Sequence, residues 1–144
     1  MSPEPLQPKA KVLVVDDQPV NIQIIHQILN ADYQIFMATS GAQAISLCQS
    51  NPPDLILLDV MMPELDGLAT CRLLKQQPQL AQIPVIFVTG LHSQEEENQC
   101  WQAGGADFVI KPVNAVTLKH RIKNHLQIRQ LSDLVHQLKN GIPG

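Results

Sequence analysis

Short, strongly apolar segments alternate with longer amphipathic segments along most of the chain. The apolar segments are rich in valine and isoleucine, which favours strands. The segments between them repeat apolar side chains at about 3.6 residues, the period of a helix. The pattern therefore predicts strands that alternate with helices. The predicted strands are 11–16, 33–38, 54–59, 83–89 and 106–111.

Residues with a local conformational preference mark where the predicted helices begin. Pro19 suits a first helical turn, where no amide donor is required, and Ser40 can cap the next helix. Ser93 begins a helix with three glutamates in its first turn, where the helix dipole favours anions. The last predicted helix runs from about Asn114 to about Lys139 and is longer than the others.

This alternation predicts an α/β fold, a doubly wound five-stranded parallel sheet with helices on both faces and an extended C-terminal helix. The apolar run Leu55–Leu58 suits a strand that is covered on both faces. Crossover connections between such strands are right-handed. Functional groups are then expected at the carboxyl ends of the strands.

The length of 144 residues suits one domain. Residues 1–10 hold three prolines and no apolar period, so we expect a flexible leader, followed by a domain at 11–128 and a helical extension at 129–144. Apolar residues in the extension are spaced by 3, 4, 3 and 4. This spacing fits a homodimer seam or a helix that leads to an output domain, and a helix end that packs on its own domain would show it too. These residues are Ile128, Leu131, Val135, Leu138 and Ile142.

Composition and charge exclude several classes of protein. The longest aliphatic runs are four residues, so we expect no membrane span, and the N-terminus lacks the pattern of a secretory signal. Three widely separated cysteines favour free thiols in a reducing cytoplasm.

Residues 1–110 carry 4 basic and 12 acidic side chains (−8), and residues 111–144 carry 6 basic and 1 acidic (+5). The basic side chains are interleaved with apolar residues and lack aromatic neighbours, so we expect a solvated helix face and no direct nucleic-acid binding.

Side chains capable of chemistry stand at the ends of the predicted strands. Asp16 and Asp17 end the first strand, Asp59 the third, Thr89 the fourth and Lys111 the fifth. Because the carboxyl ends of parallel strands meet at one edge of the sheet, we expect all five side chains to converge there.

Such a group of side chains could bind a metal ion and a phosphoryl group. Adjacent carboxylates repel one another unless a cation lies between them, and Mg²⁺ suits a site of few carboxylates and water. Lysine can neutralise a phosphoryl oxygen, and aspartate can accept phosphate as an acyl phosphate. Asp59 is the candidate acceptor because it ends the most apolar strand, whereas Asp16 and Asp17 would bind the metal. A single aspartate at a strand end is more often a cap, so the interpretation depends on the whole set.

Four motifs resemble those of the receiver domain of two-component response regulators. They are VLVVDDQP (Val12–Pro19), LILLDVMMPELDG (Leu55–Gly67), PVIFVTG (Pro84–Gly90) and GADFVIKP (Gly105–Pro112), in the family's order. The resemblance covers roughly residues 10–128. It implies a flavodoxin-like fold with strand order 2-1-3-4-5.

The resemblance also implies roles for individual residues. Asp59 would be the phosphoacceptor. Asp17 would bind Mg²⁺ or Mn²⁺ directly, Asp16 would do so partly through water, and the backbone carbonyl of Met61 would be a further ligand.

The same resemblance assigns the phosphate contacts and a conformational switch. Thr89, the backbone amide of Gly90 and Lys111 would hold the phosphoryl group, and the peptide bond before Pro112 would be cis. Thr89 and Phe108 would form the switch pair, which reshapes the surface of the fourth helix, fifth strand and fifth helix. In the family, alanine is more usual at the position of Gly90, and the backbone amide should still serve. Tyrosine is also common at the position of Phe108, and phenylalanine lacks the hydroxyl through which a tyrosine could contact an output partner.

A receiver domain would take its phosphoryl group from a sensor histidine kinase or a phosphotransfer protein in the cytoplasm. It would catalyse only its own phosphorylation and dephosphorylation. A phosphatase or phosphomutase is an alternative, but that class would use an aspartate two residues after the nucleophile, where this chain has Met61. A phosphorylation-independent interaction module is another, but it would be expected to lack one of the acidic groups or the lysine.

Overall fold

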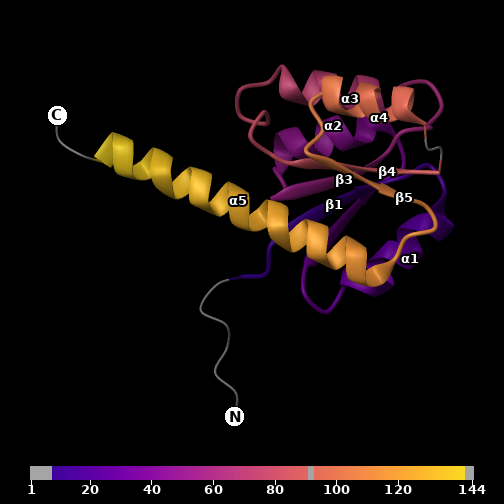
Figure 1. The fold of residues 1–144 in the computed structure, drawn as a ribbon, viewed down its shortest axis with the longest axis horizontal. Helices are drawn as coiled ribbons and strands as arrows, with labels where there is room; N and C mark the ends of the chain where they lie inside the picture. The colour runs from indigo at the N-terminus through magenta and orange to yellow at the C-terminus, as the bar shows by residue number, and fades with distance from the viewer. Residues whose placement is uncertain (1–7, 91–92, 142–144) are drawn as a thin grey trace, which may run out of the picture.

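A computed structural model describes residues 8–90 and 93–141 of the chain. Most of the leader expected at 1–10, and the last three residues of the expected extension, lie outside these ranges. The core is a five-stranded parallel sheet with the order β2-β1-β3-β4-β5, so the sequence prediction of the fold and strand order is confirmed (Figure 1). The strands are β1 (Lys11–Val15), β2 (Gln34–Ala38), β3 (Leu55–Asp59), β4 (Val85–Thr89) and β5 (Asp107–Ile110).

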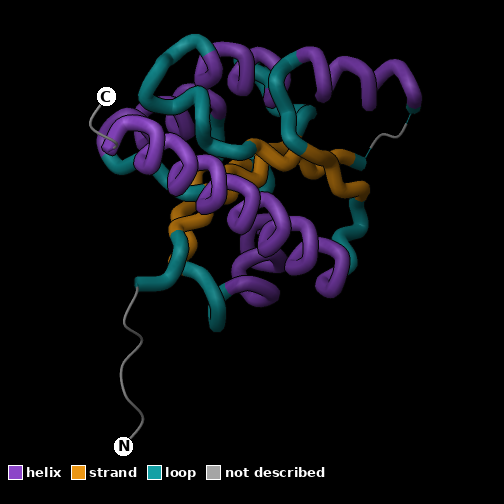
Figure 2. The backbone as a smooth tube through the Cα atoms, turned by 60° about the vertical axis from the view of Figure 1, so that its left-hand side comes forward, coloured by secondary structure: helices purple, strands orange, loops and turns teal. Residues whose placement is uncertain are grey.

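Helices cover both faces of the sheet (Figure 2). Helices α2, α3 and α4 pack on one face and α1 and α5 on the other, and each face has its own cluster of buried side chains. The sheet lies between two helical layers because the apolar side chains on both faces of its central strands must be removed from water. The helices are α1 (Pro19–Leu29), α2 (Gly41–Ser50), α3 (Gly67–Lys75), α4 (Gln94–Gln102) and α5 (Ala115–Gly141).

The central strand β3 shows why the run Leu55–Leu58 is apolar throughout. All five of its residues are buried. Leu55 and Leu57 belong to the cluster under α1 and α5, whereas Ile56 and Leu58 belong to the cluster under α2, α3 and α4. Alternate side chains of a strand point to opposite faces, so burial on both faces requires an unbroken apolar run.

Local signals in the sequence set most helix starts. Pro19 occupies the first turn of α1. Ser40 Oγ accepts a hydrogen bond from the Gln43 amide at 3.1 Å, and Ser93 Oγ accepts one from the Glu96 amide at 3.1 Å. The first contact confirms the predicted cap at Ser40, and the second shows that Ser93, the predicted start of α4, is also a cap. Each serine satisfies an amide that the first helical turn leaves without a partner.

Several element ends differ from the sequence prediction by one or two residues, and two of them concern the site and the last helix. β5 ends at Ile110, so Lys111 lies just beyond the strand, although its amide still donates to the Thr89 carbonyl at 2.8 Å. Pro112 has no amide hydrogen with which to continue the ladder. Helix α5 does not stop near Lys139 but continues through Gly141. A glycine lowers helix stability without preventing helical geometry.

The three cysteines lie on α2, α3 and α4 and are buried free thiols, as predicted. Burial raises the pKa of each thiol to about 11. They are therefore protonated at neutral pH and act as small apolar side chains in the core. They are Cys48, Cys71 and Cys100.

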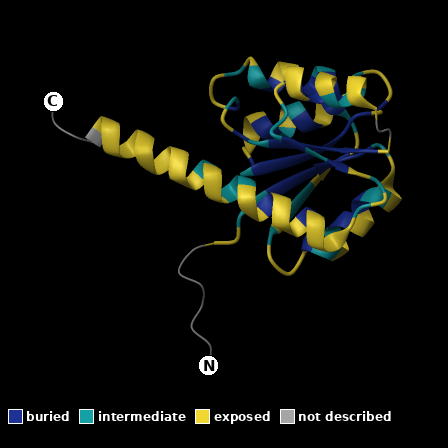
Figure 3. Ribbon diagram, viewed as in Figure 1, coloured by how far each residue is buried: buried dark blue, intermediate teal, exposed yellow. Residues whose placement is uncertain are grey.

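The long helix α5 has two parts with different surroundings. Leu118 and Ile122 are fully buried against the sheet. Residues 130–140 are all exposed, and this part of the helix projects beyond the domain (Figure 3). Among the described residues, no helix is long and apolar enough to cross a membrane.

A close approach between β3 and α3 fixes the start of α3. The Gly67 amide donates to the Val60 carbonyl at 2.9 Å, and a Cβ atom on Gly67 would lie 2.0 Å from the carbonyl oxygen of Asp59. Only glycine fits here without moving the backbone that carries Asp59.

We expect Gly67→Ala to lower the free energy of unfolding by about 2 kcal/mol or more, because the added methyl group must displace backbone atoms. Chemical denaturation would measure the loss. Gly90→Ala is the matched control, since no atom lies within 4 Å of the position of its Cβ. Similar stabilities for the two variants would contradict the packing argument.

Candidate functional site

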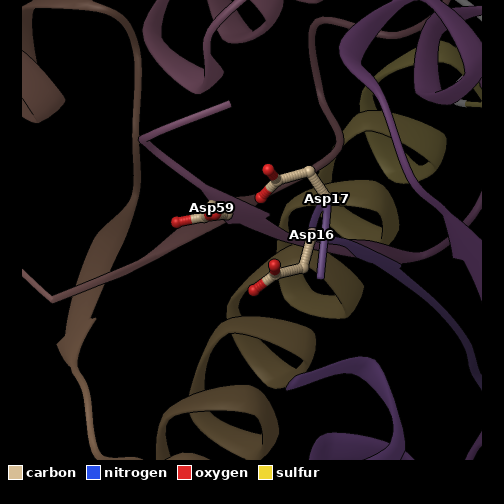
Figure 4. Close-up of side chains that lie close together, drawn as sticks. All are labelled: Asp16, Asp17 and Asp59. Carbon is tan, nitrogen blue, oxygen red and sulfur yellow. The ribbon is translucent and has the colours of Figure 1, made fainter. Parts of the chain in front are cut away.

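Three carboxylates meet at the carboxyl ends of β1 and β3. Val15 pairs with Leu58 in the parallel register, so the residues that follow each of them, Asp16 and Asp59, are neighbours at the same edge. Each of the residues Asp16, Asp17 and Asp59 offers an oxygen that lies within 4.8 Å of the others (Figure 4). Asp16 and Asp59 are only 2% and 5% exposed, and Asp17 is partly exposed. The predicted convergence is therefore present in the structure.

Lys111 reaches this acidic group from the end of β5. Its Nζ lies 3.1 Å from Asp16 Oδ2 and 3.3 Å from Asp59 Oδ1, so one ammonium group bridges two carboxylates. The Lys111–Pro112 peptide bond is cis. Three carboxylates and one ammonium group leave two formal negative charges in a site that is mostly removed from water.

The pKa values of the site reflect this imbalance. Burial raises the pKa of Asp59, the negative charge of Asp16 raises it further, and Lys111 and the Met61 amide offset only part of the increase. Burial alone would lower the pKa of Lys111, but its contacts with Asp16 and Asp59 reverse that effect, so the pKa of Lys111 is raised. The lysine therefore stays charged, and Asp59 carries a destabilised negative charge.

This donor set fits a hard divalent cation. Carboxylate oxygens are the ligands that Mg²⁺ prefers, and the charge that Lys111 leaves unneutralised equals that of one such ion. Asp17 is the most exposed of the three carboxylates and leaves the site open to water and to a ligand. Met61 directs its side chain outward, with 62% of the residue exposed. The role of its carbonyl as a ligand stays a prediction.

Thr89 is the last residue of β4, the strand next to β3, and Gly90 follows it. Val88 pairs with Asp59 in the register, which places Thr89 one residue beyond it at the same edge. Thr89 is 2% exposed, and its Oγ1 donates a hydrogen bond to Glu96 Oε1 of α4. Gly90 is exposed, with open space where a side chain would begin.

Sequence reasoning missed the contact of Glu96 with Thr89, because it explained the three glutamates of α4 by the helix dipole. The pattern Ser93-x-x-Glu96 does identify Glu96 as the third residue of the helix, where a side chain can turn back toward the preceding loop. It does not reveal that Thr89 lies in the direction of the carboxylate.

Phe108 lies partly buried on β5 and contacts α4. Its ring meets the ring of Trp101 edge to face, with centroids 5.9 Å apart and planes at 75°. Trp101 is 44% exposed and is the only tryptophan of the chain. No pattern in the sequence indicates this pairing, because the two residues belong to different elements.

A second ion-paired group, also missed from sequence, joins β5 to α5. Asp107 is buried, and its Oδ2 lies 3.1 Å from Arg121 Nη1 and 3.0 Å from His125 Nε2. Arg121 and His125 are four residues apart on α5, which is the only hint that they share a face. This group attaches the helix to the strand that carries Phe108.

Comparison with known proteins gives consistent results. The family model for the response regulator receiver domain matches residues 12–123. A probable cyclic di-GMP phosphodiesterase of Vibrio cholerae serotype O1 is 39% identical over 135 residues, which are 94% of this chain and 30% of that protein. The chain thus spans less than a third of that relative. The polar-differentiation response regulator DivK of Brucella ovis is 32% identical over 116 residues, covering 80% of this chain and 94% of that protein.

A solved structure with the same fold carries a metal ion. It is the receiver domain of a sensor histidine kinase from Pseudomonas aeruginosa PAO1, described with a magnesium ion coordinated in its active-site cleft. It is 28% identical with a TM-score of 0.78, and the match covers 83% of this chain and 99% of that one.

The raised pKa of Asp59 has a consequence for stability. The charged form lowers stability, and this penalty develops as the pH rises from the ordinary carboxyl pKa through the folded-state pKa. We expect Asp59→Asn to raise the free energy of unfolding at neutral pH, without divalent metal, by on the order of 1 kcal/mol. The gain should disappear in acid, where wild-type Asp59 is protonated.

Thermal unfolding in the presence of a chelator and then of Mg²⁺ would test this. Mg²⁺ should stabilise the wild type more than Asp59→Asn, because binding to the folded state adds to stability. The exposed Asp32 gives a matched control. Asp32→Asn should change neither the stability without metal nor the stabilisation by Mg²⁺. An Asp59→Asn variant that is less stable than the wild type in the chelator, or that Mg²⁺ stabilises as much as the wild type, would contradict the electrostatic account.

Proposed function

Because the chain belongs to the response regulator receiver family, we propose that Asp59 accepts a phosphoryl group from a sensor histidine kinase or a phosphotransfer protein. The observation that carries the proposal is the convergence of Asp16, Asp17 and Asp59, with Lys111 bridging two of the three carboxylates. Phosphoryl acceptance needs a nucleophile whose negative charge is poorly stabilised, together with cations that stabilise the transferred group.

In the proposed reaction a carboxylate oxygen of Asp59 attacks the phosphorus atom of a phosphohistidine. The P–N bond breaks, the imidazole leaves, and an acyl phosphate forms. Lys111 moves from its two carboxylates toward a phosphoryl oxygen and stabilises the charge there. Asp16, Asp17 and Asp59, with the Met61 carbonyl, would hold Mg²⁺ or Mn²⁺, which would neutralise the carboxylates and phosphoryl oxygens.

Thr89 and the Gly90 amide complete the proposed phosphate site from the end of β4. Movement of the Thr89 hydroxyl toward the phosphoryl group would leave room for the Phe108 ring to turn inward. That turn would separate Phe108 from Trp101 and change the surface of α4, β5 and α5. The contact between these two rings supports α4 as the element that responds.

We propose that this domain acts as a cytoplasmic signalling switch and catalyses only its own phosphorylation and dephosphorylation. An aspartyl-phosphate phosphatase would need a general acid two residues after the nucleophile, and the exposed thioether of Met61 cannot supply a proton. The whole set of acidic and basic groups is present, which disfavours a module that works without phosphorylation.

We further propose that residues 11–128 form the receiver and residues 129–144 an extension that leads to an output domain and pairs with a second copy of the chain. β-Branched residues at the first seam position and leucines at the fourth favour parallel two-stranded coiled coils. Ile128, Leu131, Val135 and Leu138 follow this pattern and are 51–64% exposed. The greater length of the Vibrio cholerae relative is compatible with a further domain.

Phosphorylation can be tested with a small-molecule phosphodonor. Wild-type protein with Mg²⁺ should gain the mass of one phosphoryl group, and the adduct should be stable in acid and labile in base. Asp59→Asn should lose labelling completely, because the acceptor oxygen is absent, whereas Asp32→Asn should be labelled as the wild type is. Labelling of the Asp59→Asn variant would refute the assignment of the acceptor.

The proposed dimer can be tested by sedimentation as a function of protein concentration. Leu131→Glu combined with Leu138→Glu places charges in the seam and should weaken self-association at least about tenfold. Gln130→Glu adds an exposed charge outside the seam and should change little. A wild type that stays monomeric at all concentrations would rule out this part of the proposal.

A further inference from the structure

Glu96 contacts one of the residues assigned to the phosphate site, and no role in the reaction has been given to it. We infer that Glu96 is a positioning residue that holds the Thr89 hydroxyl away from Asp59 and thereby opposes phosphoryl binding. This inference rests on the proposed function, because it concerns the hydroxyl that would bind the phosphoryl group. The contact that carries it is the hydrogen bond from Thr89 Oγ1 to Glu96 Oε1.

The position of Glu96 is set by the start of α4. Ser93 caps the helix by accepting a hydrogen bond from the Glu96 amide, which fixes the backbone of Glu96 in the first turn. Its side chain is half-buried and turns back toward the end of β4. Thr89 is almost fully buried. The contact is therefore formed between two anchored residues, which lowers the entropy that ordering it would cost.

The hydroxyl of Thr89 can serve only one of the two acceptors. A threonine hydroxyl has a single proton, so it donates one hydrogen bond at a time. A carboxylate is a strong acceptor, and it stabilises the observed arrangement more than a neutral group would. Transfer of the donor to a phosphoryl oxygen at Asp59 must first break the bond to Glu96.

Helix α4 thus contacts both members of the proposed switch pair. Glu96 accepts from Thr89 at the start of the helix, and Trp101 packs against Phe108 near its end. Release of Thr89 by Glu96 would remove one of these two attachments. Glu96 therefore links occupation of the phosphate site to the position of α4, and its bond favours the unphosphorylated state.

The test measures binding of beryllofluoride, a tetrahedral phosphoryl mimic, to the full chain in the presence of Mg²⁺, with Trp101 fluorescence as the signal. We expect Glu96→Ala to bind roughly tenfold more tightly, because the competing acceptor is gone. Glu96→Gln should fall between Glu96→Ala and the wild type, since its amide oxygen still accepts but carries no charge. Affinity for Mg²⁺ alone should be equal in all variants.

Two controls separate this role from a merely structural one. Glu95→Ala removes the same charge from the same helical turn, but Glu95 is exposed whereas Glu96 is half-buried. This variant should bind beryllofluoride as the wild type does. In a Thr89→Val background the hydroxyl is absent, so Glu96→Ala should no longer tighten binding. Circular dichroism would establish that each variant is folded. If Glu96→Ala does not fold, Glu96→Gln provides the comparison with the wild type.

The outcomes distinguish this inference from the function on which it rests. If the wild type binds beryllofluoride and neither Glu96→Ala nor Glu96→Gln binds it more tightly, the role of Glu96 is overturned and the phosphoacceptor site is not. An equal gain in Glu95→Ala, or a gain that persists with Thr89→Val, would reduce the effect to general electrostatics and also overturn it. A wild type that fails to bind beryllofluoride would overturn the proposed function and this inference together.

Discussion

The mutual repulsion of three carboxylates at one edge of the sheet is the constraint on which the site depends. Asp16 and Asp59 are almost completely removed from water, and a single lysine bridges them. The fold tolerates this arrangement because β1 and β3 are held in register by an apolar core on both faces. The energy of that core keeps the charged groups close together, and the raised pKa of Asp59 expresses the resulting strain. Binding of a cation there would relieve the repulsion between the carboxylates.

Much of the fold and part of the site could be predicted from the sequence, because the positions of the strands determine both. Apolar runs such as Leu55–Leu58 identify buried parallel strands, and parallel strands place the residues that follow them at one edge. Asp16, Asp59 and Lys111 therefore meet as expected, although Lys111 lies just past its strand. Position indicated Asp59 as the candidate acceptor, and the resemblance to a family supplied the roles of Met61, Gly90 and Phe108, which position alone does not indicate.

The contacts that could not be predicted are those made by side chains between helices and strands. Glu96 looked like a response to the helix dipole, and only the structure shows that its carboxylate accepts from Thr89. The pairing of Trp101 with Phe108 likewise depends on how α4 sits beside β5. Periodicity determines which face of a helix is buried, but the rotation and tilt of that helix against one strand depend on the packing of the whole layer.

The direction of the C-terminal extension is set by two groups of contacts at the amino ends of β5 and β3. Asp107 binds Arg121 and His125 beside Phe108, and farther along α5 the Arg129 guanidinium donates to the Asp54 carbonyl at 2.9 Å. A continuous helix held at two such points keeps its direction beyond them, because its backbone hydrogen bonds resist bending. The exposed residues 130–140 thus have a defined orientation relative to β5. A helix that merely frayed from the domain would have no such relation to the strand that carries Phe108.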